Sequence, residues 1–345
     1  MMLMINASGT QQCGSESDAW YPGRKSETMS GHVLILVAAV IGVSSAMGFE
    51  PPGPQQRFEA IGATNGLAGL LQRAFTPGDD FQPVPAPGPS DWLAVHREPG
   101  QTFDEFRRSQ VDRPDARRRS IYLQPLGEFP GPHSPSRETF REYATRFFQM
   151  EVKALPPVSI RASGFTSRTN PMTGRRQILT EDVLRWLKDR LPTDAFCLLA
   201  ITMEDLYPEA SWNFVFGQAS LTERVGVYSF GRYDPAFYGQ PRAKGDDKLV
   251  LRRSMKVLTH ETGHLFGLAH CIYFSCVMNG SNHLQESDQR PLHLCPVCLR
   301  KLQFSVGFDV VQWYEALAQF HRQAGFDDEA AWLTGRVERI RGVSK

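Results

Sequence analysis

Two histidines and a glutamate in the C-terminal half of the chain have the spacing of a metal-binding motif. Residues 260–264 read HETGH, which fits the pattern H-E-x-x-H. On a helix, residues four apart project from nearly the same face, so His260 and His264 can bind one metal ion together. Zinc accepts such nitrogen ligands at about 2.0–2.1 Å. The motif therefore predicts a zinc site on a helix.

A third histidine completes the ligand set. The chain continues through Gly267 to His270, which gives the longer pattern H-E-x-x-H-x-x-G-x-x-H. Gly267 lies where a helix can end on a left-handed residue, a conformation that glycine adopts at little cost. The chain can then turn so that His270 approaches the same metal. Three protein ligands leave one coordination position for water, which is the arrangement of a catalytic zinc.

Glu261 provides the base that such a site needs for hydrolysis. It is next to a ligand in the sequence, so its carboxylate is expected to point towards the open coordination position. Zinc lowers the pKa of bound water to about 7, and a positioned carboxylate can accept the proton and later pass it to a leaving amine. We therefore expect hydrolysis of peptide bonds by a zinc-activated water, with Glu261 as the general base.

Four of the six cysteines cluster just after the third histidine. Cys13 and Cys197 stand alone, whereas the others share one C-terminal stretch: Cys271, Cys276, Cys295 and Cys298. A late cluster that ends in C-x-x-C favours metal binding. Four thiolates complete a tetrahedral zinc and leave no open position, so such a site would be structural. Two disulfides are the alternative, which gains weight if the chain is secreted.

The histidine motif and the cysteines together resemble those of the archaemetzincins, a family of metzincin zinc peptidases. The shared string is H-E-x-x-H-x-x-G-x-x-H-C-x4-C-x-M, followed by C-x-x-C. Its methionine is Met278, at the place of the methionine turn that supports a metzincin metal site from beneath. Further segments resemble the animal branch of the family, namely residues 90–93, 211–218, 280–284 and 294–299. The resemblance covers roughly residues 85–315.

This resemblance implies an α/β fold with a twisted, mostly parallel mixed sheet, a long active-site helix and C-terminal helices. It also implies two zinc ions per chain, one catalytic and one structural in the four-cysteine site. In one respect the chain departs from better-known metzincins. Several groups place a tyrosine two residues after the turn methionine, where this chain has Gly280. The residue that stabilises the oxyanion is therefore left open, and Tyr273, although near in the sequence, is not assigned that role.

The elements that must position these residues follow from hydrophobic periodicity. We expect strands at residues 120–126, 158–162, 195–203 and 225–230, and helices at 60–75, 137–150, 178–190, 250–266, 308–324 and 327–341. Strands that alternate with helices imply a mainly parallel sheet covered by helices. The glycine-containing strand at 225–230 is expected at a sheet edge, where it could bind an extended peptide by strand addition or simply end the sheet.

Composition divides the chain into three parts. Residues 1–50 form an N-terminal extension whose apolar run, 33–43, is shorter than the roughly 20 residues of a membrane span. Residues 51–117 are rich in Pro, Gly and Arg and are expected to be a leader with a short helix. Residues 118–345 are expected to form the metallopeptidase domain, including the cysteine site and the C-terminal helices. The flanks of the apolar run also allow residues 29–48 to act as a signal peptide.

Charge and composition limit the partners. Lys and Arg number 38 against 37 Asp and Glu, so a net charge of +1 provides no overall field to recruit nucleic acid or a membrane surface. We expect a peptide or protein substrate, no stable membrane insertion and a monomer. The expected compartment is the cytoplasm or nucleus, or the outside of the cell if residues 29–48 are a signal.

Two other functions remain open. One is a catalytically silent interaction protein that zinc stabilises, although a purely structural site has no use for Glu261. The other is a different zinc hydrolase with the same ligands, but nothing in the sequence points to nucleotides or sugars. The sequence also leaves open whether a peptidase of this kind would act as an endopeptidase or an aminopeptidase.

Overall fold

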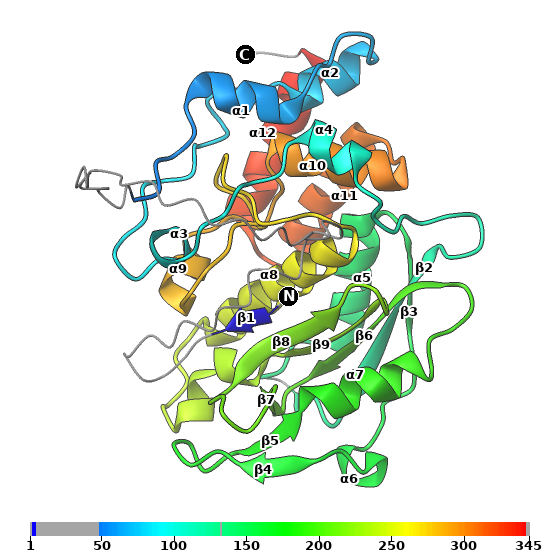
Figure 1. Ribbon diagram of the computed structural model, residues 1–345, viewed down its shortest axis with the longest axis vertical. Coiled ribbons are helices and arrows are strands. Elements are labelled where there is room, and N and C mark those ends of the chain that lie inside the picture. The colour runs from blue at the N-terminus through cyan, green and yellow to red at the C-terminus, as the bar shows by residue number, and fades with distance from the viewer. Residues whose placement is uncertain (1, 5–47, 132, 343–345) are drawn as a thin grey trace, which may run out of the picture.

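A twisted mixed sheet forms one layer of the protein and helices cover both of its faces (Figure 1). The computed structural model describes residues 2–4, 48–131 and 133–342. The main strands follow the order β3-β2-β6-β9-β8-β7-β5-β4 across the sheet. Their bounds are β2 Ser120–Leu126, β3 Glu151–Ala154, β4 Ser167–Thr169, β5 Arg176–Leu179, β6 Ala195–Thr202, β7 Asp205–Tyr207, β8 Val215–Ser220 and β9 Val225–Ser229.

The sheet is mostly parallel, as expected. Of the seven pairings along this order, four are parallel, β3-β2, β2-β6, β6-β9 and β7-β5. The other three, β9-β8, β8-β7 and β5-β4, are antiparallel. A further strand, β1 (Met2–Met4), pairs antiparallel with β8 on the side opposite to β9.

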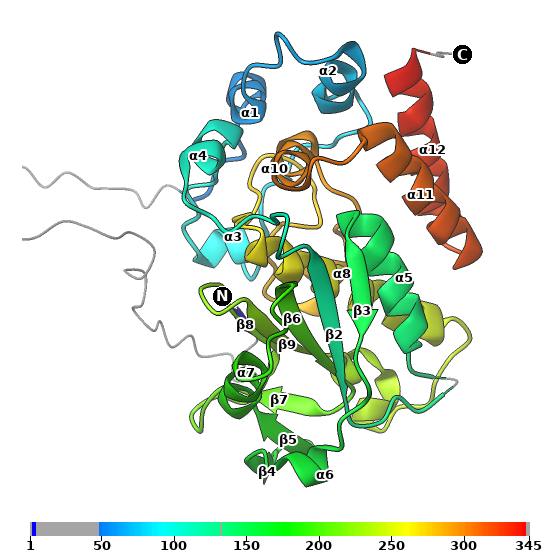
Figure 2. The same cartoon turned by 90° about the vertical axis from the view of Figure 1, so that its right-hand side faces the viewer.

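The sheet separates two apolar cores. Strands β2 and β6 are buried along their whole length, and Figure 2 shows helices on both sides of them. Because alternate side chains of a strand point to opposite faces, neighbouring residues enter different cores. Ile121 and Leu199 join the larger core, which also holds α5, α8 and the C-terminal helices, whereas Leu198 and Val227 join a smaller one under α7.

The helix that carries the histidine motif, α8 (Asp246–Leu265), runs across the larger core. Asp246 and Asp247 occupy its first turn, where negative charge is favourable next to the helix dipole. The remaining helices are α1 Pro54–Ile61, α2 Gly69–Phe75, α3 Trp92–Val95, α4 Phe103–Arg108, α5 Arg137–Phe148, α6 Ile160–Ser163, α7 Thr180–Lys188, α9 Leu284–Asp288, α10 Pro296–Val306, α11 Val310–Gln323 and α12 Asp327–Arg341. Two 3-10 helices, Gly231–Tyr233 and Pro235–Tyr238, precede α8. The α/β fold with a long helix and C-terminal helices is confirmed.

Three local predictions are wrong, each for a physical reason. The helix expected at 60–75 is two helices, α1 and α2, because Gly62 and Gly66 in between have φ angles of 76° and 90°. The strand expected at 158–162 is reduced to one bridge from Val158 to Leu126, after which α6 begins. The strand expected at an edge, β9, lies between β6 and β8 and is paired on both sides, so it cannot receive a peptide by strand addition.

The segment before residue 118 shares the larger core with the rest of the chain. Its side chains Ile61, Phe75, Phe81 and Phe106 are buried in the same cluster as Leu258 of α8. The division at residues 117 and 118 stays a prediction, but the apolar packing is continuous across it. The proposed signal segment lies outside the described residues except for Gly48. None of the described helices is long and apolar enough to cross a membrane.

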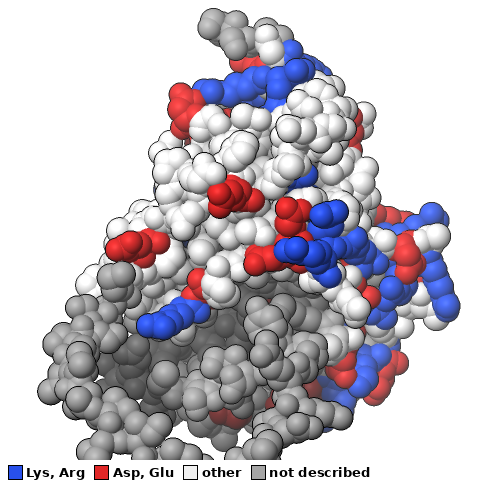
Figure 3. Space-filling model, turned by 45° about the horizontal axis from the view of Figure 1, so that its top comes forward, with Lys and Arg blue, Asp and Glu red and all other residues white. Residues whose placement is uncertain are grey.

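On the face in Figure 3, basic and acidic side chains lie beside one another with uncharged residues between them. Several form ion pairs, such as Arg339 with Asp79 at 2.7 Å.

Candidate metal centres

The three predicted histidines converge on one point. Helix α8 carries His260 and His264, whose Nε2 atoms are 3.0 Å apart, and the Nε2 of His270 lies 3.2 Å from that of His260. All three side chains are buried. The structure therefore brings together the three residues that the spacing selected, with their Nε2 atoms facing one another.

The opposite nitrogen of each ring has an oxygen acceptor. The Nδ1–H of each histidine donates to a carbonyl or carboxylate oxygen, His260 to Val277 O at 2.9 Å, His264 to Leu268 O at 2.5 Å and His270 to Glu98 Oε1 at 2.7 Å. A neutral imidazole has one proton, so Nε2 is left with a bare lone pair in each ring. Three lone pairs pointing at one another repel unless a cation lies between them. These donors therefore fit a zinc ion, which binds neutral imidazole nitrogens.

Burial keeps the three rings neutral. It lowers the pKa of His260 to about 4 and holds the pKa values of His264 and His270 well below the ordinary value of 6.5. A histidine must be unprotonated to bind a metal. At neutral pH the rings therefore need no proton loss before they can act as ligands.

The turn that returns His270 to the site is built on Gly267. Its φ angle is 81°, in the left-handed region that glycine adopts without strain. A Cβ atom at this position would also lie 2.3 Å from the side chain of Val111. The helix therefore ends as the sequence predicted, and its end packs against the segment that precedes β2.

Glu261 is buried beside these ligands, with 1% of its surface exposed. Its Oε2 atom has no hydrogen-bond partner among the described residues. Burial raises the pKa of Glu261 to about 7. A buried carboxylate oxygen without a partner is unusual in a folded protein, and such an oxygen fits a site for a ligand or water.

Met278 lies directly under the motif. A Cβ atom on Gly263 would come within 2.6 Å of the Met278 sulfur. The thioether therefore packs against the helix backbone between the two ligands that α8 supplies, the place predicted for the methionine turn. The same contact favours glycine at the fourth position of HETGH, which the bare pattern H-E-x-x-H does not specify.

Two residues that the sequence analysis missed hold His270 in place, and both come from the segment before residue 118. Glu98 accepts the Nδ1–H of His270, and the Trp92 indole N–H donates to the same carboxylate at 2.8 Å. The Trp92 ring also stands edge-on to the His270 ring, with centroids 4.9 Å apart. The only signal for this contact was the family-like stretch at residues 90–93.

The same tryptophan explains the glycine after the methionine turn. A Cβ atom on Gly280 would lie 2.5 Å from Cδ1 of Trp92. A tyrosine, which other metzincins have at this position, would not fit beneath the indole.

We predict that Glu98→Ala weakens zinc binding at the histidine site by about 10–100-fold, because carboxylates that orient a ligating histidine typically contribute that much. Glu98→Gln should lose less, since its amide oxygen can still accept the Nδ1–H of His270. Competition with a chromogenic chelator at fixed pH measures the effect. The exposed Glu128→Ala is the control. Wild-type affinity in Glu98→Ala would show that His270 needs no such partner.

The four clustered cysteines also meet at one point. The sulfurs of Cys271, Cys276, Cys295 and Cys298 are buried and lie within 4.8 Å of one another. None of the five cysteines that the structure describes is in a disulfide. Cys271 Sγ and Cys295 Sγ are 3.5 Å apart, close to the separation of about 3.8 Å that a tetrahedral site with Zn–S bonds of 2.3 Å requires. The geometry favours a metal site over two disulfides.

Short hydrogen bonds connect this cysteine cluster to the histidine site. The amide of Cys271, which follows His270, donates to the carbonyl oxygen of Met278 at 2.8 Å. The side-chain amide of Asn279 donates to the carbonyl oxygen of Cys271 at 2.6 Å, and its oxygen accepts from the amide of Cys276 at 2.7 Å. One loop therefore positions ligands of both candidate sites.

A third group of potential ligands is already used for structure. Its members are Asp91, His283 and Glu286. The Glu286 carboxylate accepts from the Asn282 amide at 2.7 Å and from Arg290 at 3.0 Å, and His283 contacts Asp91 at 3.1 Å. These contacts tie the loop before α3 to α9 and give no sign of a third metal.

Comparisons by family, by sequence and by structure all find related proteins. The pattern of peptidase family M54 matches residues 144–304. Archaemetzincin-2 of Macaca fascicularis is 42% identical over 295 residues, 77% of this chain and 80% of that protein. Archaemetzincin-1 of Homo sapiens is 32% identical over 77% of this chain and 61% of that protein. The crystal structure of the archaemetzincin of Methanopyrus kandleri is 29% identical and covers 56% of this chain and 99% of its own, with a TM-score of 0.42.

Proposed function

Because this chain belongs to peptidase family M54, the archaemetzincins, and is therefore a zinc metallopeptidase, we propose that His260, His264 and His270 hold its catalytic zinc and that Glu261 is the general base. The convergence of three Nε2 atoms, each on a ring whose Nδ1–H is already donated, supports the ligand set most directly. The unpartnered Oε2 of Glu261 supports the role of the base.

The chemistry divides between the metal and the carboxylate. When bound, zinc supplies a Lewis acid that polarises the scissile carbonyl and lowers the pKa of water. Glu261 accepts the proton of the attacking water at its carboxylate and delivers it to the leaving amine. Burial raises the pKa of Glu261 above that of an ordinary glutamate, which favours its acceptance of the proton from the attacking water.

We further propose that the peptide substrate pairs with β8 rather than with β9. β8 packs against the active-site helix α8. Beyond its single bridge to β7 at Val215, the outer edge of β8 has only β1 as a partner within the described residues. The antiparallel pairing of β1 with Gly217 and Gln218 supports pairing of an extended segment at this edge, and a substrate peptide would take the place of β1. Backbone pairing of this kind would align a peptide alongside the three histidines.

The decisive experiment measures zinc per chain and peptide turnover on the same preparations of the full chain. We expect two zinc ions in the wild type, one for each cluster, and cleavage within a peptide library. His264→Ala should lose one zinc together with all cleavage, because two histidines cannot hold the metal in an open three-ligand site. His133→Ala, which removes a partly exposed histidine outside both clusters, should lose neither.

The library should contain peptides with free and with blocked amino termini. Cleavage of blocked peptides would identify an endopeptidase, and cleavage restricted to free termini an aminopeptidase. If the wild type contains zinc at the histidine site and cleaves no peptide of either kind, the catalytic role proposed for Glu261 is wrong and the zinc-stabilised interaction protein becomes the better description.

A further inference from the structure

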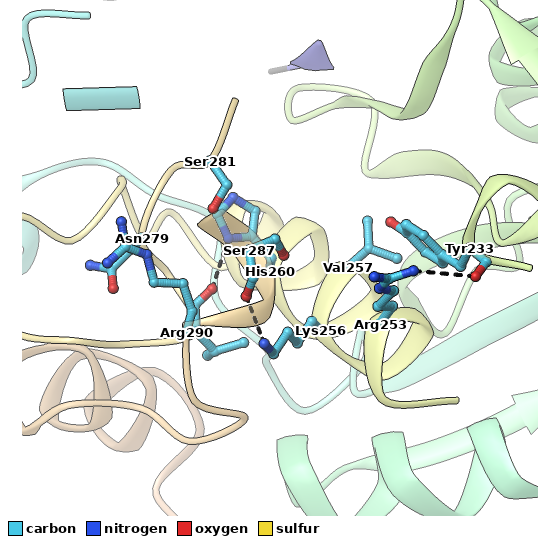
Figure 4. A pocket seen from close by; sticks show the side chains of 10 residues that line it. Tyr233, Arg253, Lys256, Val257, His260, Asn279, Ser281, Ser287 and Arg290 are labelled. Atoms are coloured by element: carbon cyan, nitrogen blue, oxygen red, sulfur yellow. Dashed lines mark hydrogen bonds between the residues drawn. The ribbon is translucent and has the colours of Figure 1, made fainter. Parts of the chain in front are cut away.

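A small cavity lies beside His260, between α8 and the chain that follows Met278 (Figure 4). Its volume is about 30 Å³, and its lining includes Arg253, Lys256, His260 and Arg290. Such a volume holds about two water-sized atoms. His260, a proposed zinc ligand, forms part of the wall. A group that enters the cavity therefore lies next to the proposed reacting centre.

Helix geometry makes the cavity a continuation of the metal site. Arg253, Lys256 and His260 are spaced at i, i+3 and i+7, which places them on one face of α8. The same face leads on to His264, one turn after His260. A peptide that crosses the three histidines would therefore place a neighbouring side chain over this cavity.

The cavity is lined by positive charge. Three cationic side chains contribute to its wall, and among the described residues no carboxylate does. Arg253 is paired with Asp288 at 2.6 Å and Arg290 with Glu286 at 3.0 Å, but both acids lie outside the wall. These two pairs are neutral overall, so Lys256, which forms no ion pair among the described residues, is the cation that leaves the wall with positive charge.

One of these cations has a hydrogen-bond donor without an acceptor. The Arg290 side chain is 8% exposed, and its Nε–H has no partner in the described part of the chain. Lys256 donates to the carbonyl oxygens of Ser287 at 2.6 Å and Asp288 at 3.1 Å, neither of which neutralises its charge. A buried, unpaired guanidinium nitrogen is costly, so an anionic acceptor that reaches it gains a strong hydrogen bond.

We propose that this cavity is a specificity subsite for an acidic side chain of the peptide substrate, next to the scissile bond. The inference rests on the peptidase function proposed above and specifies its substrate class. The two oxygens of a carboxylate fill about the space of the two waters that the cavity holds. Arg290, Lys256 and Arg253 would then bind the carboxylate of a glutamate or aspartate.

The test compares peptides that differ only by glutamate or glutamine at one position, scanned through the two residues on each side of the cut. At pH 7 the glutamate is ionised and nearly the same shape as glutamine. We expect the full-length wild type to cleave the glutamate peptide with a kcat/KM about 10- to 100-fold higher at one position adjacent to the scissile bond, the range for a desolvated charge-assisted hydrogen bond.

Two variants should reduce this preference. Lys256→Met and Arg253→Gln each remove one charge from the wall, so the glutamate-to-glutamine ratio should fall at least several-fold. Arg253→Lys keeps the charge and should retain most of the preference. Lys248→Gln removes an exposed cation from the same helix, away from the cavity, and should leave the ratio unchanged. An unchanged ratio in both Lys256→Met and Arg253→Gln would overturn the proposal, as would a wild-type ratio near one at every position.

A binding measurement separates failure of this subsite from failure of catalysis. Fluorescently labelled versions of the two peptides are titrated against Glu261→Gln, which lacks the general base but keeps the cavity. Tighter binding of the glutamate peptide, lost on adding Lys256→Met, supports the subsite even if the wild type cleaves nothing. Equal binding of both peptides contradicts it whatever the catalytic result.

Discussion

Glu261→Ala should abolish peptide hydrolysis and leave the zinc content of the protein unchanged. The three histidine Nε2 atoms are the proposed zinc ligands, and Glu261 is not among the atoms that converge there. Removal of a positioned proton acceptor typically costs about 10²–10⁴-fold in rate. The loss should reach at least that range, because the same carboxylate serves both proton transfers.

The same substitution should not destabilise the fold. The carboxylate is buried, and one of its oxygens lacks a hydrogen-bond partner among the described residues. Burial of such a group is unfavourable, so its removal offsets much of the packing lost with the side chain. We expect a melting temperature close to that of the wild type, and the isosteric Glu261→Gln should be equally inactive.

The measurement pairs zinc analysis with single-substrate kinetics and thermal unfolding on the same samples. Glu128→Ala, an exposed glutamate far from the motif in the sequence, controls for handling. Wild-type turnover in Glu261→Ala would remove this residue from the mechanism. Loss of zinc together with activity would show instead that the carboxylate holds the metal site together.

The convergence of the candidate metal ligands could be predicted from the sequence because their geometry is local. His260 and His264 are placed by helical periodicity alone, and Gly267 marks the end of the helix within three residues of the second ligand. The helix itself shows in the apolar spacing of residues such as Val250 and Leu258, both buried. The cluster of four cysteines could be recognised just as easily, since they fall within 28 residues, from Cys271 to Cys298.

The features that could not be predicted from the sequence depend on contacts between distant segments. Glu98 lies 172 residues before His270, and no periodicity connects the two. The order of strands is likewise a property of the whole chain. The pattern of β9 resembles that of an edge strand because it contains a glycine, but Gly226 is there because the Tyr228 hydroxyl would lie 2.3 Å from a Cβ atom at that position. Packing within the sheet, not exposure, selected the residue.

The division into leader and peptidase domain shows the same limit. Residues 51–117 look unlike a folded domain, since proline and glycine interrupt most of the segment outside the helix expected at 60–75. In the structure their short helices nevertheless pack on α10 and α12, and Arg336 from α12 donates to the carbonyl oxygens of Arg73, Ala74 and Thr76 at 2.9–3.0 Å. Composition described the irregular backbone correctly but carried no information about what the backbone packs against.

Cys298→Ala should have a wider effect than loss of a catalytic ligand, and cost the protein both zinc ions. Binding of zinc by cysteine ligands contributes about 10–16 kcal/mol in zinc-finger peptides, so a closed site of this type supports the fold around it. Here the fold around it includes the histidine site. Cys271 follows His270 directly, and Cys276 is two residues before Met278, whose sulfur packs under Gly263.

The two variants should lose zinc and thermal stability to different extents. His264→Ala should lose one zinc and keep a cooperative melting transition, because the cysteine cluster is untouched. Cys298→Ala should lose both zinc ions and all peptide cleavage, with a large drop in melting temperature, because the loop that holds His270 and Met278 loses its anchor. Graded chelation of the wild type should show the same order, with activity disappearing before the fold melts.

Cys197→Ala is the matched control, since it also removes one fully buried sulfur but lies on β6, outside the cluster. It should cost only the packing of one small side chain and retain two zinc ions. If Cys298→Ala behaves like Cys197→Ala, the cysteine cluster holds no metal, and thiol titration of the denatured wild type would then decide between free thiols and two disulfides. If Cys298→Ala loses one zinc but still cleaves peptides, the two sites are independent, and the hydrogen bonds between Cys271, Asn279 and Met278 do not transmit the stability of one site to the other.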